Sequence, residues 1–90
     1  MKTEFRKSFE RDLKRISRDA ALFQRIRDVL AEVEGARTLS EVTSLKRLSG
    51  GNGTYYRIRI GDYRLGLEFL DGTVVFVRCL HRRDLYRYFP

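Results

Sequence analysis

The stretch TYYRIRIGDYRLGLEFLDG, residues 54–72, decides the fold of the second half of the chain. Apolar and polar residues alternate along it, which is the period of a β-strand with one buried face. Within 54–60 the isoleucines point to one face, and Arg57 and Arg59 point to the other. A second alternating run follows Gly61, so the stretch predicts two antiparallel strands joined by a tight turn.

Further strands are predicted on both sides of this pair. Asp71-Gly72 is a strong signal for a β-hairpin, and it leads into residues 74–80. That run is apolar on both faces, as a central strand should be. Before the pair, residues 45–48 are a short candidate strand, and the glycine-rich segment 49–53 is a turn or loop. The tail, residues 81–90, is basic and aromatic and is expected to form a helical turn.

The first half of the chain has the periodicity of helices. Apolar residues at 9, 13 and 16 form one helical stripe, for which Ser8 is the expected N-cap. Apolar residues recur at helical spacing across 22–33, with Ser17 or Asp19 as the cap and Gly35 as a natural end. Residues 1–5 are a candidate short strand. The order predicts an α+β fold, a single domain over 1–90, with two helices on one face of an antiparallel sheet.

The composition favours a protein of the cytoplasm that binds a polyanion. The net charge is +7, and 15 of the 19 basic residues are arginine, which binds phosphate with paired hydrogen bonds. No apolar run approaches the roughly 20 residues that cross a bilayer, and the N-terminus lacks the apolar core of a signal peptide, so no membrane partner is expected. The single cysteine, Cys79, agrees with a reducing compartment and is expected to be a small buried hydrophobe.

Cations should gather on the open face of the sheet. Arg57 and Arg59 share a strand face, Arg64 lies on the polar side of the next strand, and Arg78 lies near the end of the last strand. Such a face could bind phosphates while nearby tyrosines stack on bases. Simpler roles stay open: solvated strand positions for the first pair, an ion pair with Glu68 or Asp62 for Arg64, and extension of Arg78 to a sheet edge. Glu68 itself is expected to pair with an arginine.

The tail holds the other candidate groups. His81 is the only histidine, and histidine can take and give a proton near neutral pH without help. It is expected just after the last strand, beside Arg82 and Arg83, although a lone histidine is often structural. Tyr86 is a candidate for acid catalysis or base stacking, with packing of the tail as its alternative. The spacing supports no zinc site and no phosphate-binding loop, so neither a metal nor another cofactor is expected.

Three segments carry a resemblance to a known family. The run YRIRIGDYR at 56–64 and the tail HRRDLY at 81–86 resemble the RelE/ParE superfamily of type II toxins, and the RelE branch in particular. The opening of the first helix, KSF at 7–9 with Asp12-Leu13, is similar as well. The resemblance covers essentially the whole chain. It implies two N-terminal helices packed on a twisted antiparallel sheet.

The resemblance also implies a function and its partners. RelE-like toxins enter the ribosomal A site and cut the mRNA there without a metal, and a cognate antitoxin wraps the toxin and blocks it. On this match the chain is an endoribonuclease whose partners are mRNA, the ribosome and an antitoxin. Two alternatives remain: a ParE-like inhibitor of DNA gyrase, and a non-catalytic module that binds RNA or the ribosome.

The family motif assigns roles residue by residue. The catalytic set is Arg57, Arg64, Arg82, Tyr86 and His81, with the arginines stabilising charge, Tyr86 stacking the base or assisting proton transfer, and His81 as base or acid. The residues expected to bind the RNA are Lys46, Arg59, Arg78 and Arg83, and Arg83 is also the alternative to Arg82. The chain departs from the family in having two arginines where lysines are common, and Leu80 where a glycine is frequent. Arginine keeps its proton at neutral pH, which moves the base role to His81 or leaves it open.

Overall fold

The computed structural model describes residues 1–50 and 52–90, so Gly51, part of the expected loop at 49–53, lies outside the described residues. The elements in chain order are β1 (Lys2–Phe5), α1 (Lys7–Arg15), α2 (Ala20–Gly35), a 3-10 helix η1 (Leu39–Glu41), β2 (Leu45–Arg47), β3 (Tyr55–Ile60), β4 (Tyr63–Leu70), β5 (Thr73–His81) and α3 (Leu85–Tyr88). The α+β class, the strand at the N-terminus and the helical turn in the tail are confirmed.

The strands form one five-stranded sheet in the order β1-β5-β4-β3-β2. The four strands from β2 to β5 pair antiparallel, as their alternation predicted. β1, however, is parallel to β5, so the sheet is mixed rather than wholly antiparallel. Residues 2–5 pair with residues 73–76, and no local sequence pattern encodes a partner so far along the chain. Because of this added edge strand, β5 has a neighbouring strand on each side, as a central strand does, which explains its apolar character on both faces.

The predicted hairpin between β4 and β5 is present. Asp71 and Gly72 connect the strands with φ values of 47° and 78°. Two successive left-handed residues are the requirement of the tight turns that match the twist of a hairpin, and Asp-Gly satisfies it at low cost. The turn therefore follows directly from the sequence.

The helix boundaries confirm two predictions and correct one. The Asp19 carboxylate accepts a hydrogen bond of 3.0 Å from the backbone N–H of Leu22, so Asp19 is the cap of α2, and the helix ends at Gly35 as expected. α1 instead begins after Arg6, which makes no side-chain cap. Ser8 is inside the helix, and its hydroxyl donates a hydrogen bond of 2.5 Å to the carbonyl of Val77 in β5.

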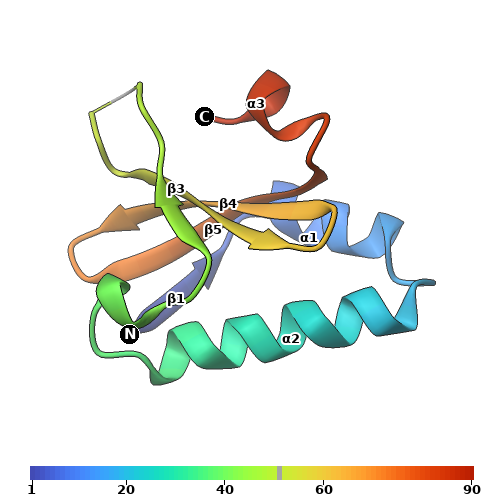
Figure 1. The fold of residues 1–90 in the computed structure, drawn as a ribbon, viewed down its shortest axis with the longest axis horizontal. Helices are drawn as coiled ribbons and strands as arrows, with labels where there is room; N and C mark the ends of the chain where they lie inside the picture. Colours follow the sequence, from blue (N-terminus) through green and yellow to red (C-terminus); the bar gives the residue numbers. More distant parts are fainter. Residues whose placement is uncertain (51) are drawn as a thin grey trace.

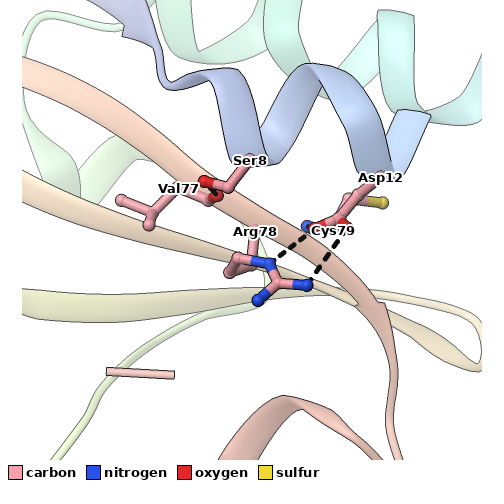
Figure 2. Close-up of polar contacts among 5 residues, drawn as sticks. All are labelled: Ser8, Asp12, Val77, Arg78 and Cys79. Carbon is pink, nitrogen blue, oxygen red and sulfur yellow. Dashed lines mark hydrogen bonds and ion pairs between the residues drawn. The ribbon is translucent and has the colours of Figure 1, made fainter. Parts of the chain in front are cut away.

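Side chains of α1 form hydrogen bonds with the backbone of β5 beyond the end of β1 (Figure 2). β1 pairs only with residues 73–76, and a free strand edge presents unpaired backbone groups. Ser8 bonds the carbonyl of Val77, and the Asp12 carboxylate accepts from the backbone N–H of Cys79 at 2.9 Å. Asp12, only 3% exposed, also accepts from Nε and Nη2 of Arg78 at 2.8 and 3.1 Å. Side chains of a helix thus complete the hydrogen bonding of the central strand.

The two N-terminal helices α1 and α2 pack on one face of the sheet, as expected, and the short tail helix α3 lies on the other. α2 lies below the sheet and α3 above it in Figure 1. The larger core joins α1 and α2 to the lower face and includes Phe9, Ile26, Leu65 and Phe76. A smaller cluster on the other face consists of Leu48, Leu85 and Phe89, with Tyr55, Val77 and Leu80 packed against it. The tail therefore covers part of the face that the sequence had left open.

Candidate functional site on the cationic sheet face

Strand pairing brings four basic side chains to one face of the sheet. Arg59 lies opposite Arg64 across β3 and β4, and Arg57 lies opposite Lys46 across β3 and β2. Residues directly opposite in an antiparallel pair project to the same side. Because Arg57 and Arg59 are two residues apart, all four share one side, which we call the cationic face. The strand pairing groups Arg57, Arg59 and Arg64 as the alternation predicted, and it adds Lys46 to them.

Arg64 is at the centre of the positive charge. Its guanidinium Nη1 donates to the carbonyls of Gly61 and Tyr63, each at 2.9 Å, which fixes the side chain beside the β3–β4 turn. Its pKa is lowered by burial, then by the charges of Arg59 and Arg57, and also by Arg82; Tyr86 acts in the opposite direction. No ion pair to Glu68 or Asp62 forms among the described residues; the Glu68 carboxylate instead accepts from Thr54 at 3.3 Å.

Arg57 holds an unused donor. Its Nη1 donates to the carbonyl of Ser44 at 3.0 Å, and the same carbonyl accepts from the backbone N–H of Arg59 at 3.2 Å. Ser44 has a left-handed φ of 59°, which turns its carbonyl toward the arginines. Nε of Arg57 is buried, and within residues 1–50 and 52–90 it is the one buried side-chain nitrogen or oxygen without a hydrogen-bond partner. A buried donor without a partner carries a desolvation cost, which the backbone around Ser44 does not relieve.

The tail adds Arg82 and Tyr86 to the same region. Both influence the pKa of Arg64, so both lie within electrostatic reach of it. Arg82 is held by its backbone N–H, which donates to the carbonyl of Asp62 at 2.7 Å, and its side chain makes an exposed ion pair of 3.9 Å with the Asp62 carboxylate. Tyr86 is 62% exposed, so the alternative of a packed tail tyrosine does not apply to it.

His81 and Arg83 do not join this group. His81 is the last residue of β5 rather than a residue after it, and it lies opposite Tyr63, whose ring contacts its imidazole edge-on at 5.5 Å between centroids. Tyr63 packs against the larger core, on the face opposite the cations. Arg83 lies against His81, because its Nε and its backbone N–H donate hydrogen bonds of 3.3 and 3.2 Å to Nδ1 of His81. Arg82, and not Arg83, is thus among the charges that act on Arg64.

Comparison with known proteins identifies the family. Residues 3–86 match the family model described as the ParE toxin of the type II toxin–antitoxin system parDE. The toxin RelE3 of Methanocaldococcus jannaschii is 37% identical over 91 residues, covering the whole of both chains. The chain belongs to the ParE toxin family. The expected relation to the RelE/ParE superfamily is thereby confirmed.

Solved structures agree with the assignment of the toxin to this family. The toxin in the RelB–RelE antitoxin–toxin complex from Methanococcus jannaschii is 36% identical and superposes with a TM-score of 0.80, covering 97% of this chain and 99% of that one. The YoeB dimer of Staphylococcus aureus has a TM-score of 0.72 over 90% of this chain and 95% of its own. Its identity is 18%, so this second likeness concerns the fold alone.

Arg78 of the toxin has a place in the fold that the sequence left undecided. The hydrogen bonds that its guanidinium donates to the Asp12 carboxylate raise the pKa of Arg78, although burial acts against that. The guanidinium carbon also lies 5.7 Å from the ring centroid of Tyr88, a cation–π contact that reaches α3. The sequence pattern did not predict the pairing of Arg78 with Asp12. An acidic residue beside an apolar helical stripe, together with an arginine inside an apolar strand, was the available signal for a buried pair.

Other chemistries find no support in the described part of the toxin. Cys79 is buried, and burial raises the pKa of its thiol to about 12, with a further contribution from Asp12, so it is no nucleophile. Among residues 1–50 and 52–90, no three histidine, cysteine, aspartate or glutamate side chains lie close enough to hold a metal ion. The described helices include none with the length and apolar character needed to traverse a bilayer.

Proposed function

We propose that this toxin is a ribosome-dependent endoribonuclease that cuts mRNA on its cationic face. The observation that carries the proposal is the set of like charges around Arg64. Arg59, Arg57 and Arg82 each disfavour the charged form of Arg64, and a phosphate placed among them would relieve this repulsion.

The chemistry proposed for this face is attack by a ribose 2′-oxygen on the adjacent phosphorus. The O2′–P bond forms and the P–O5′ bond breaks. The 2′ proton passes to solvent water, and the 5′ oxygen gains a proton from the Tyr86 hydroxyl, which water then restores. Arg57, Arg64 and Arg82 stabilise the negative charge that grows on the phosphorane oxygens. Pre-placed donors of this kind typically contribute about 100- to 1000-fold in rate. Arg59 and Lys46 bind neighbouring backbone phosphates. No step calls for a metal or another cofactor.

Proton transfer is proposed for Tyr86 rather than His81. Arginine keeps its proton at neutral pH, so Tyr86 is the member of this group with a hydroxyl that can supply one. Its exposure leaves the ring available to stack on a base or to reach the leaving oxygen. His81 faces the other side of the sheet and is engaged with Tyr63 and Arg83. It is therefore assigned no step.

The partners proposed for the toxin follow from its charge and its relatives. A segment of an acidic antitoxin fits the cationic face, and the related toxin from Methanococcus jannaschii was crystallised with its antitoxin RelB. Messenger RNA in the ribosomal A site is the proposed substrate, which places the toxin in the cytoplasm. Arg83, away from the scissile group, would contribute to RNA binding through its charge alone. Arg78, also expected to bind RNA, is engaged with the buried Asp12 carboxylate and is assigned no RNA contact.

An in vitro translation reaction with primer extension on the mRNA tests the proposal. The purified toxin should produce cuts within A-site codons only when ribosomes are present. Arg64→Ala should remove the cuts, while Arg27→Ala, which deletes an exposed cation of α2, should leave them unchanged. Intact mRNA with normal translation would overturn the hypothesis that the toxin is a nuclease. A gyrase supercoiling assay would then test the ParE-like alternative.

A further inference from the structure

The short helix α3 depends on the sheet for its position. It has four residues, too few to be stable through its own hydrogen bonds. Leu85 and Phe89, one helical turn apart, are 0% and 3% exposed, so both face the sheet. Tyr86 and Tyr88 lie between them in sequence and are exposed. The two buried side chains are therefore the anchors that fix the direction of the two tyrosines.

Phe89 occupies a notch that Gly66 creates in β4. A Cβ added at Gly66 would lie 2.7 Å from Cδ2 and 2.9 Å from Cγ of the Phe89 ring, closer than real contacts allow. Gly66 has no left-handed φ, so its backbone conformation does not require glycine. The need is space: any side chain at this position would displace the ring. Tyr55 completes the notch with an edge-on contact of 5.5 Å between ring centroids.

The notch is next to the cationic face. Gly66 lies directly opposite Arg57 on β3 and opposite Arg78 on β5. Tyr86, three residues before Phe89, acts electrostatically on Arg64, which is two residues before Gly66 in the same strand. Gly66, over which the Phe89 ring lies, and Arg64, on which Tyr86 acts, are thus neighbouring positions on one face of β4.

We propose that Phe89, seated over Gly66, is a positioning residue that holds Tyr86 beside Arg64. The inference rests on the proposed function, since the role of Tyr86 is defined there. Phe89 itself touches no substrate. It acts through Tyr86 by keeping the backbone of α3 in one place. Gly66 contributes by leaving room for the Phe89 ring.

An activity-independent measurement comes first, using the toxin, residues 1–90, labelled with ¹⁵N. The amide of Tyr86 should have an order parameter near 0.85 in the wild type and in Phe89→Leu, and below about 0.6 in Phe89→Ala. Unchanged amide shifts in β3, β4 and β5 would show that the sheet stays folded. A rigid Tyr86 in Phe89→Ala would overturn the proposal. Gly66→Ala should loosen Tyr86 as well, and it should add nothing to Phe89→Ala, where the ring is gone.

Cleavage kinetics then separate positioning from general stability. Phe89→Ala should lower kcat for mRNA on ribosomes by about 10-fold or more while KM stays the same, and Phe89→Leu should restore it. In a Tyr86→Ala background, Phe89→Ala should have no further effect. An equal loss in both backgrounds would overturn the positioning role. Absence of cleavage by the wild type would remove the proposed function, and the order parameters alone would then decide whether Phe89 holds Tyr86.

Discussion

Asp12 on α1 and Arg78 on β5, 66 residues apart in sequence, form a two-point ion pair at 2.8 and 3.1 Å (Figure 2). The same carboxylate accepts a hydrogen bond from the backbone N–H of Cys79. One buried side chain therefore joins the first helix to the central strand, and it completes the hydrogen bonding of that strand where β1 stops. Because Arg78 also contacts the ring of Tyr88, the pair links α1 to the tail as well.

Removal of this carboxylate should destabilise the toxin strongly. Asp12→Ala leaves the Arg78 guanidinium and the Cys79 N–H without their acceptor in a site that is largely shielded from water. We expect the free energy of unfolding to fall by about 3 kcal/mol, the cost usually measured when one partner of a buried pair is deleted. Urea denaturation followed by circular dichroism measures it.

The matched control is the exposed pair between Asp62 and Arg82. Its side chains are 73% and 63% exposed and lie 3.9 Å apart. Asp62→Ala should therefore change the free energy of unfolding by less than about 0.5 kcal/mol. Equal effects of the two substitutions would show that Asp12 has no special structural role.

Cys79 should make stability depend on alkaline pH. Its thiol has a pKa of about 12 in the folded protein, above the ordinary value of 9.0, because burial disfavours the thiolate. The unfolded chain loses this proton first, so the contribution is fully present below about pH 9 and falls as pH rises toward 12, by up to about 1.4 kcal/mol per pH unit.

The difference in unfolding free energy between wild type and Cys79→Ala isolates this effect from other titrating groups. We expect the advantage of the wild type to shrink between about pH 9 and pH 11. A constant difference over that range would contradict the assignment. The native thiol should also resist a thiol-specific reagent at neutral pH until the protein is unfolded in urea.

Arg59 should contribute to RNA affinity through charge alone. Each phosphate that a cation neutralises adds about 0.7 to the slope of log affinity against log salt for a single strand. Fluorescence anisotropy with a short single-stranded RNA should show a slope lower by about this amount for Arg59→Ala. Arg27→Ala on α2 is the control, and its slope should equal that of the wild type. An unchanged slope for Arg59→Ala would place the RNA elsewhere.

Much of the sheet is predictable because its signals are local. Alternation in 54–70 fixes which side chains share a face, and Asp71-Gly72 fixes the turn through two left-handed residues. The cationic face follows from the alternation together with the tight turn at Gly61-Asp62, since Arg59 and Arg64 must lie opposite each other once the register of the β3–β4 hairpin is set.

The missed features depend on contacts between distant segments. Ser8 has the chemistry of an N-cap, but the open edge of β5 uses its hydroxyl instead. His81 was grouped with the arginines by its sequence neighbours, yet one more residue of strand turns it to the other face. Phe89 was one of several tail aromatics, and only the absence of a side chain at Gly66 shows why this ring is the buried one.

The most direct test compares Arg64→Ala with His81→Ala in one ribosome-dependent cleavage assay, at enzyme in excess over mRNA–ribosome complexes. We expect Arg64→Ala to cut at least about 100-fold more slowly than the wild type, because it loses a charge-stabilising donor. His81→Ala should stay within about threefold of the wild type, because its imidazole lies on the opposite face of the sheet. Loss of cleavage in His81→Ala with normal rates in Arg64→Ala would contradict the placement of the active site on the cationic face.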